Sequence, residues 1–334
     1  MDKMKIVFCG SGEFGRPTLR RLMAGAAAGA ALAVPDVEIV LVVTQPPRPA
    51  GRGGQLRPTA IAQEAEKLGL PVATVEKVNA PECVEMLRRL EADLLLVADF
   101  GQFIREPARR TFRLGAINLH GSVLPALRGA APVNWAIIRG LTRTGVTTFS
   151  LVDKMDAGAV YVRKETDIRP EETADELRVR LAEIGVEAVV ETLHLLAAGQ
   201  TAGEAQDEAQ ATLAPLMKKE DGVINWSADA ATIRNLIHGT WSWPGARTQY
   251  VSPEGKPLEV VLARAKAWDA EAGIAAGPPG AIEPDLTVAT GSGWLEILEI
   301  KPAGGRLMPW KAFVNGHRVR AGAKFVTLSI DQPQ

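Results

Sequence analysis

The sequence predicts a doubly wound, Rossmann-like α/β domain followed by a small, OB-like β-barrel. Through residues 1–199, short apolar and β-branched runs alternate with amphipathic segments of helical length, as in a parallel sheet covered by helices. From residue 218 onward, short strands are separated by turn signals such as those at 252–255 and 277–280, which favours a barrel. The chain has 334 residues, enough for two domains, which we place at 1–199 and 218–334 with a linker at 200–217.

Each element of the first domain follows from a local pattern. The apolar run at 37–43 predicts a strand that is buried on both faces of a parallel sheet. Pro17 suits the first turn of a helix, because its missing N–H costs little there. An apolar stripe predicts a long amphipathic helix at 173–198. The complete prediction has strands at 5–9, 37–43, 71–73, 93–98, 116–119, 146–151 and 160–165, the last two as an antiparallel pair, and helices at 17–23, 61–68, 81–90, 132–139 and 173–198.

The rest of the chain has weaker signals. Residues 45–58 are rich in glycine and proline and are predicted to form a loop. The Ala/Gly-rich tract at 24–34 is expected to extend a helix or a loop. Residues 200–214 are polar and show no sustained period, as expected of a linker. Strands of the barrel are predicted at 258–263, 280–282, 287–290 and 295–300.

The composition excludes several classes of protein. The longest apolar run falls short of the roughly 18 residues that a membrane span needs, so no membrane partner is expected. Two cysteines make no disulfide framework, which favours the reducing cytoplasm. The four histidines are scattered without metal-ligand spacing, so no metal is expected. The net charge of −1 does not indicate a nucleic-acid partner, although local basic patches could still bind one. We expect a monomer.

The glycine-rich start raises a rival hypothesis. Gly10, Gly12 and Gly15 fit G-x-G-x-x-G between a strand and a helix, the context of a nicotinamide dinucleotide site. That site also needs an acid at the end of the second strand, where this chain has Thr-Gln-Pro-Pro at 44–47. A tight turn and close helix–sheet packing explain the glycines equally well. We therefore expect no NAD.

Polar side chains gather after residue 116. Asn118 and His120 stand two apart at the end of a predicted strand, so both point to the same side of the sheet at its carboxyl edge. Asp153 and Asp156 lie in a turn between two later strands, and either could be an ordinary solvated turn residue. His120 alone could be a satisfied core histidine. Together these residues suit acyl transfer to an amine: an amide or imidazole donor stabilises the oxyanion, and a His beside a carboxylate moves the proton. Without a placed nucleophile, direct displacement is preferred to an acyl-enzyme.

Residues 118–132, NLHGSVLPALRGAAP, followed by Asp153 and the Asp156-Ala157-Gly158 turn, resemble the signature of folate-dependent formyltransferases. Residues 97–104, VADFGQFI, resemble the pterin-pocket strand and loop of that family. The resemblance implies that the donor is 10-formyltetrahydrofolate. It also implies a catalytic set of Asn118, His120 and Asp156, and folate contacts from Ser122, Val123, Leu124, Pro125, Phe100, Gly101, Gln102 and Asp153.

Within that family, the chain is most similar to the members that act on methionyl initiator tRNA. Residues 44–53 resemble their basic loop, 218–226 the start of their C-terminal domain, and 301–308 their late hairpin. The resemblance implies transfer of formyl to the α-amino group of that tRNA, and tRNA contacts from Arg48, Arg52, Arg57, Lys218, Lys219 and Arg306. The alternatives are a sugar-nucleotide formyltransferase, a formyltetrahydrofolate hydrolase-type domain and a tRNA-binding protein without catalysis.

The chain departs from the family pattern at four places. Residues 121–127 lack the basic or aromatic residue that often precedes the arginine of the central motif, and Asp99-Phe100 replaces a commoner Ala-Tyr. Gly305-Arg306 stands where two lysines are usual, and the tract at 24–34 resembles an insertion. These departures concern the pterin contacts and one phosphate contact, and they leave Asn118, His120 and Asp156 in place.

Overall fold

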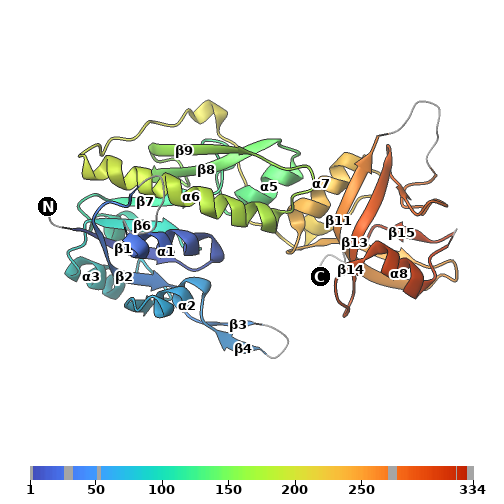
Figure 1. The fold of residues 1–334 in the computed structure, drawn as a ribbon, viewed down its shortest axis with the longest axis horizontal. Helices are drawn as coiled ribbons and strands as arrows, with labels where there is room; N and C mark the ends of the chain where they lie inside the picture. Colours follow the sequence, from blue (N-terminus) through green and yellow to red (C-terminus); the bar gives the residue numbers. More distant parts are fainter. Residues whose placement is uncertain (1–2, 26–32, 51–53, 270–276, 321, 329–334) are drawn as a thin grey trace. The chain divides into compact units, whose positions relative to one another are not determined.

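The computed structural model describes residues 3–25, 33–50, 54–269, 277–320 and 322–328. It divides into two compact units (Figure 1). Unit 1 comprises Met1–Pro132, Thr144–Thr166 and Arg178–Pro215, and unit 2 comprises Val133–Arg143, Asp167–Leu177 and Leu216–Gln334. Two stretches of unit 2 therefore come from within the first 199 residues. The domain boundaries predicted from the sequence, 1–199 and 218–334 with a linker at 200–217, stay a prediction.

Unit 1 is built around a seven-stranded sheet with the order β5-β2-β1-β6-β7-β8-β9. The pairs from β5 to β7 are parallel, and β8 runs antiparallel to β7. This order confirms the predicted doubly wound α/β architecture, with a mixed edge. The strands are β1 (Met4–Gly10), β2 (Val37–Thr44), β5 (Val72–Thr74), β6 (Leu94–Ala98), β7 (Ala116–His120), β8 (Arg143–Ser150) and β9 (Val160–Asp167).

Both faces of this sheet are covered, because successive residues of a strand point to opposite sides. On β1, Val7 and Cys9 pack against α3, where Leu87 is also buried. Phe8 points the other way and lies near Ile61 of α2. The helices of the first 199 residues are α1 (Arg16–Ala24), α2 (Ala60–Lys67), α3 (Pro81–Arg89), α4 (Glu106–Arg109), α5 (Pro132–Ile138) and α6 (Ala174–Ala197).

The five predicted helices are confirmed, with ends that differ by one residue at most. Two features were missed. The segment at 45–58, predicted as a loop, contains the hairpin β3 (Arg48–Ala50) and β4 (Gln55–Arg57). Its three-residue strands are too short for an alternating apolar pattern, and Figure 1 shows the hairpin projecting beside α2. The short helix α4 has only four residues, too few for a helical period.

Unit 2 contains an antiparallel sheet with the order β12-β13-β11-β10-β15, and β14 pairs with β13. The segment at 280–282, predicted as a strand, supplies only single bridges: Ala281 to Lys324 of β15, and Ile282 to Val288 of β12. Because these bridges connect the two ends of the sheet, they nearly close the predicted barrel. Its strands are β10 (Ala246–Val251), β11 (Pro257–Trp268), β12 (Val288–Ala289), β13 (Trp294–Pro302), β14 (Met308–Pro309) and β15 (Lys324–Val326).

The barrel is filled by aromatic rings and flanked by helices that the sequence pattern did not reveal. These helices are α7 (Ala230–Thr240) and α8 (Trp310–His317). Trp226 stacks on Phe325 with ring centroids 5.3 Å apart, and Trp310 stacks on Phe313 at 5.5 Å. Large buried rings dominate the energetics of a small core, so these residues hold unit 2 together.

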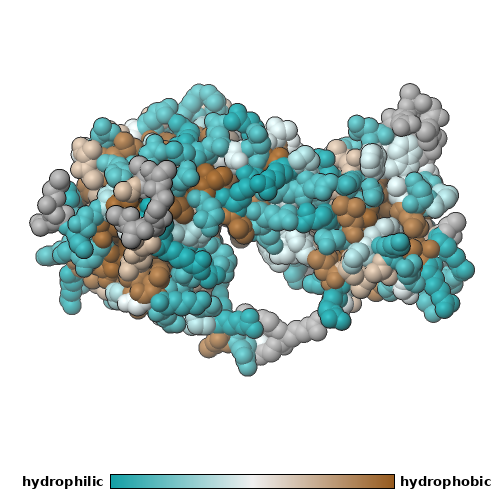
Figure 2. All heavy atoms as spheres, in the orientation of Figure 1, coloured by the Kyte–Doolittle hydropathy of each residue, from teal (hydrophilic) through white to brown (hydrophobic). Residues whose placement is uncertain are grey.

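The surface of the described residues carries scattered apolar side chains. Figure 2 shows hydrophilic residues over most of the drawn face, with apolar patches between them. None of the helices in the described ranges has the length and apolar character needed to span a bilayer. Cys9 and Cys83 are free and buried, and burial raises the pKa of both thiols, as expected of core residues.

His238 of α7 gives unit 2 a pH-dependent stability. Its side chain is buried, its Nε2 accepts from Ala265 N at 3.2 Å, and burial lowers its pKa to about 4, with Arg234, Arg264 and Glu171 as the charged neighbours. The unfolded histidine binds a proton near pH 6.5. Between these two values the unfolded state holds more protons, so stability rises with pH.

We therefore expect the free energy of unfolding to be constant above about pH 7 and to fall by about 2–3 kcal/mol towards pH 4.5. Urea denaturation of the wild type and of His238→Gln at both pH values measures the effect. Glutamine can accept from Ala265 N but does not titrate, so its stability should fall less. Equal losses in the two proteins would show that His238 is not responsible.

Candidate active site

The site is centred on the carboxyl end of β7. Asn118 is paired with Phe149 across the sheet, and His120 with Thr147. Because residues two apart point to the same face, Asn118 and His120 lie together as the sequence predicted. His120 is 6% exposed. The half-buried Asn118 amide has no hydrogen-bond partner among the described residues, so it is available to a ligand.

His120 is held on both ring nitrogens. Its Nε2 lies 3.0 Å from Leu127 O, and its Nδ1 lies 3.8 Å from Asp156 Oδ2. A carbonyl oxygen only accepts, so Nε2 carries the hydrogen in this contact and Nδ1 is the basic nitrogen. The distance to Asp156 suits an ion pair with a protonated ring and is too long for a hydrogen bond.

Asp156 reaches His120 from a turn that folds back over the sheet. β8 ends beside the start of β7, where Ser150 pairs with Ile117, yet the Asp156 carboxylate lies at the far end of β7. Its Oδ2 accepts from Gly129 N at 2.8 Å. Asp156 has φ +48°, in the left-handed region that few side chains adopt. The structure thus brings the three predicted catalytic residues to one end of β7, and their roles stay predictions.

Asp153, in the same turn, makes a different contact. Its Oδ1 accepts from Arg109 Nη2 at 2.8 Å, and Arg109 also donates to Ile104 O. Arg109 of α4 is buried, whereas the Asp153 side chain is 70% exposed. The pair therefore ties the turn to α4. The predicted folate contact of Asp153 remains a prediction, and Arg109 was not found from the sequence.

The loop after β7 is held by local hydrogen bonds. Ser122 Oγ donates to the carbonyl four residues on, at 2.6 Å. Thr147 Oγ1 donates to Ser122 O at 2.7 Å and accepts from Leu124 N at 3.0 Å. Ser122 and Leu124 are buried, and Val123 and Pro125 are half-buried. Of the four predicted folate residues here, Val123 and Pro125 are the more accessible.

In the loop after β6, the side chains of Phe100 and Gln102 are turned inward. Phe100 is buried in the core, and its carbonyl accepts from Gln45 Nε2 at 2.9 Å. Gln102 Oε1 accepts from Val78 N at 3.0 Å. Gly101, with φ +76°, is exposed between them. Any folate contact from these three predicted residues would therefore come mainly from the backbone around Gly101.

The glycine-rich turn is explained by its close approach to β6 and the residue after it. A Cβ on Gly10 would lie 2.7 Å from Ala98 O, and one on Gly12 would lie 1.7 Å from Asp99 Oδ2. Although Asp99 is exposed as a whole residue, its carboxyl lies against this turn, and desolvation of that carboxyl raises its pKa above the usual range. When ionised, a carboxylate at Gly12 repels a phosphate, which argues against a dinucleotide at this turn.

Comparison with known proteins identifies the family. The model of the family described as "Formyl transferase" matches residues 4–193, and that of "Formyl transferase, C-terminal domain" matches residues 216–318. The chain belongs to the formyl transferase family. Proteins named methionyl-tRNA formyltransferase resemble this formyl transferase nearly end to end: that of Geotalea daltonii is 40% identical over 96% of this chain and 98% of its own, and that of Solibacter usitatus is 39% identical over 96% and 98%.

Solved structures share the fold of this formyl transferase. HypX from Aquifex aeolicus in complex with tetrahydrofolic acid has a TM-score of 0.58 at 18% identity, over 94% of this chain and 47% of that one. WlaRD, a sugar 3N-formyl transferase, has a TM-score of 0.60 at 13% identity, over 89% and 97%. At these identities the likeness concerns the fold alone. The family resemblance and the fold class predicted from the sequence are both confirmed.

The predicted tRNA-binding residues of this formyl transferase are exposed where they are described. Arg48 and Arg57 lie opposite one another on the hairpin of β3 and β4, and neither has a side-chain partner among the described residues. Arg52 lies outside the described residues. In unit 2, the exposed predicted residues are Lys218, Lys219 and Arg306.

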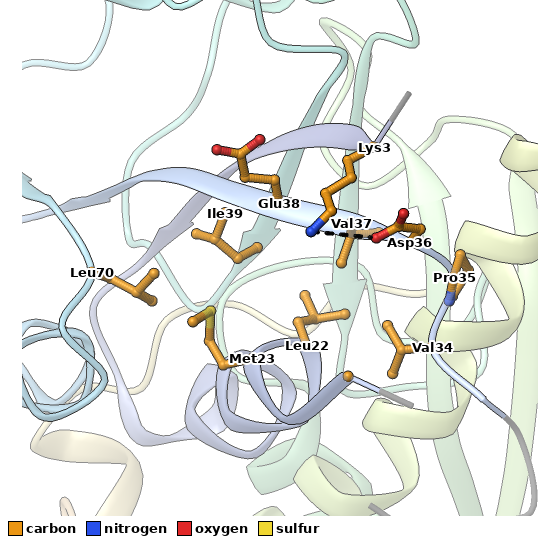
Figure 3. A pocket seen from close by; sticks show the side chains of 11 residues that line it. Lys3, Leu22, Met23, Val34, Pro35, Asp36, Val37, Glu38, Ile39 and Leu70 are labelled. Carbon is orange, nitrogen blue, oxygen red and sulfur yellow. Dashed lines mark ion pairs between the residues drawn. The ribbon is translucent and has the colours of Figure 1, made fainter. Parts of the chain in front are cut away.

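A separate pocket lies between α1 and β2 of this formyl transferase. It has a volume of about 510 Å³. Figure 3 shows Leu22 and Met23 of α1 facing Ile39 of β2, with Lys3 and Asp36 paired at 3.7 Å. Its described lining includes none of the predicted site residues and is mostly apolar, so we assign it no chemistry.

No group of acidic, histidine and cysteine side chains in the described ranges could hold a metal ion. The residues at β7 instead offer one amide donor, one imidazole and one carboxylate. An amide donor stabilises a developing oxyanion, and an imidazole beside a carboxylate transfers a proton near neutral pH. This donor set fits formyl transfer between two nitrogen atoms.

Proposed function

We propose that this formyl transferase moves the formyl group of 10-formyltetrahydrofolate to the α-amino group of methionyl initiator tRNA. The observation that carries the proposal is the meeting of Asn118, His120 and Asp156 at the end of β7, with His120 Nδ1 3.8 Å from Asp156 Oδ2. The end-to-end similarity to proteins named methionyl-tRNA formyltransferase supports the choice of substrate.

The three residues have separate tasks in a direct transfer. Asn118 donates from its amide to the formyl oxygen, where negative charge develops. His120 takes the proton that the attacking amine loses, and Asp156 stabilises the imidazolium that forms. The amine nitrogen bonds to the formyl carbon, the bond from that carbon to the donor nitrogen breaks, and the departing nitrogen receives a proton. No covalent enzyme intermediate is needed.

The folate would bind along the two loops that flank β7. The loop at 121–125 is fixed through Ser122 and Thr147, and the loop at 99–104 presents backbone around Gly101. A fixed loop loses little conformational entropy when a ligand binds. These loops follow the paired strands β6 and β7, and β7 carries the Asn118 amide, which fits a donor whose reactive carbon must reach β7. The protein would act in the cytoplasm, as a monomer, in translation initiation.

A substrate assay tests this function. The protein is mixed with 10-formyltetrahydrofolate and charged initiator methionyl-tRNA, and formyl-methionine is measured after deacylation. We expect formyl-methionine, with much less product from elongator methionyl-tRNA. Transfer to a nucleotide-linked amino sugar with no product from tRNA would overturn the tRNA assignment. Absence of transfer to any amine would overturn formyl transfer itself.

The hairpin arginines should contribute to tRNA affinity through phosphate contacts. Arg48 and Arg57 are exposed and have no ion-pair partner among the described residues, so each can neutralise a phosphate and release a counterion. The Arg48→Gln/Arg57→Gln double variant should bind tRNA more weakly, and the slope of log affinity against log salt should fall by about two. Arg88→Gln on α3, where Arg88 pairs with Glu85, is the matched control and should keep the wild-type slope. An unchanged slope in the double variant would exclude the hairpin from the tRNA interface.

A further inference from the structure

The two residues that contact the ring nitrogens of His120 share an unusual backbone conformation. Leu127, whose carbonyl faces Nε2, has φ +59°, and Asp156, whose carboxylate faces Nδ1, has φ +48°. This conformation is unfavourable for any residue with a side chain, so it persists only where surrounding contacts hold it. The contacts that hold these two residues therefore determine how His120 is presented.

Both residues are held by the segment at 204–214, which the sequence predicted as part of a linker. Thr212 Oγ1 accepts from Leu127 N at 2.8 Å. Gln206 Nε2 donates to Asp156 O at 2.8 Å and to Gly158 O at 2.7 Å. The segment thus bonds directly to the backbone of each partner of His120.

A buried arginine links these contacts. Arg128, 3% exposed, donates to Gln206 Oε1 from Nε at 3.1 Å and from Nη2 at 2.7 Å. It also pairs with Glu208, which binds Lys154 of the Asp156 turn at 2.5 Å. These two cations hold the pKa of Glu208 at about 2, so it stays ionised at any working pH. One Gln206 amide therefore joins the loop after β7 to the turn that carries Asp156.

The backbone of the segment packs as closely as its side chains. Arg128 N donates to Thr212 O and Ala214 N donates to Arg128 O. A Cβ on Gly129 would lie 2.4 Å from Ala214 O, so only glycine fits there. Gly129 N is also the donor to Asp156 Oδ2. The segment is therefore built into the walls of the site and does not merely connect two parts of the chain.

We propose that Gln206 and Thr212 are positioning residues of the formyl-transfer site. Gln206 keeps the Asp156 carboxylate beside His120 Nδ1, and Thr212 keeps the Leu127 carbonyl on Nε2, which selects the ring tautomer. Neither residue touches the reacting atoms. The inference rests on the proposed function for its kinetic consequence, but its structural claim concerns His120 alone.

Four variants separate the contacts. Thr212→Val removes the acceptor for Leu127 N, whereas Thr212→Ser retains it. Gln206→Met removes the whole amide without adding charge, whereas Gln206→Glu keeps an acceptor for Arg128 and removes the two donors to Asp156 O and Gly158 O. Gln210→Ala is the matched control in the same segment, because Gln210 is exposed and bonds only to Asp207 among the described residues.

Steady-state formylation of methionyl-tRNA gives the first readout. We expect Thr212→Val, Gln206→Met and Gln206→Glu to lower kcat by about 10–100-fold, with KM changed less than about threefold. For Thr212→Val and Gln206→Met, which introduce no charge, we also expect the pH profile of kcat to move. Thr212→Ser and Gln210→Ala should behave as the wild type. Lower thermal stability with an unchanged kcat and pH profile would show a merely structural role and overturn the proposal.

Nitrogen NMR of the four histidines gives a readout that does not need activity. In the wild type the His120 signals should report hydrogen on Nε2. In Thr212→Val this preference should weaken, and in Thr212→Ser it should return. An unchanged His120 tautomer in Thr212→Val would overturn the role of Thr212, whether or not the wild type forms formyl-methionine. A wild type that forms no formyl-methionine would instead refute the proposed function.

Discussion

Replacing His120 with alanine is expected to lower kcat for formyl transfer by about 10²–10⁴-fold while leaving tRNA affinity nearly unchanged. The imidazole is the group placed to carry a proton, with Leu127 O on one nitrogen and Asp156 on the other. It is 6% exposed, so it offers little surface to a large substrate. Single-turnover rates with saturating tRNA measure the chemical step, and filter binding measures affinity.

Asp156→Ala should reduce kcat over the same range, because it removes the charge that stabilises the imidazolium. If the two residues act as one unit, the double variant should lose about as much as one single variant. His194→Ala is a suitable control, since His194 on α6 is exposed and bonds to Ala33 O. A large loss of tRNA affinity in His120→Ala, or fully additive losses in the double variant, would contradict these roles.

Gly158→Ala is expected to lower the free energy of unfolding by about 4 kcal/mol, at the upper end of single-residue effects. The added Cβ would lie 1.6 Å from Ser150 O and 2.7 Å from Ser150 C. Both are backbone atoms of β8, so no side chain can move aside. The strands would have to separate where Ser150 N donates to Ala159 O, and Gly158 O would lose its bond from Gln206.

Calorimetry of the full chain measures the melting temperature of Gly158→Ala, with a substitution at a glycine that has free space around it as the control. Gly316 lies in α8, and beyond its own helix backbone no atom of the described residues lies within 4 Å of an added Cβ, so Gly316→Ala should stabilise by about 0.5–1 kcal/mol. If Gly158→Ala has the wild-type melting temperature, the added Cβ does not clash with Ser150 O, and this prediction is wrong. Residual Gly158→Ala activity should also be low, because the same turn carries Asp156.

Most helices and strands of the first 199 residues could be predicted because their signals are local. The apolar run of β2 and the stripe of α6 encode a buried strand and an amphipathic helix within one window of sequence. The hairpin of β3 and β4 could not be found this way, since strands of three residues are too short to show an apolar alternation. In unit 2, the 280–282 segment was predicted as a strand, but it pairs only through the single bridges of Ala281 and Ile282.

In the candidate site too, local features could be predicted from the sequence and contacts between distant residues could not. Alternation along β7 is a property of the extended backbone, so the sequence by itself determined that Asn118 and His120 share a face. Only the tertiary structure decided that Asp156 reaches His120, that Asp153 turns to Arg109, and that a polar segment read as linker holds the site together. These contacts join residues far apart along the chain, 50 positions for Gln206 with Asp156 and 85 for Thr212 with Leu127. Polar composition is the same in a free linker and in one that bonds to buried backbone, so only the packing of the whole unit distinguishes them.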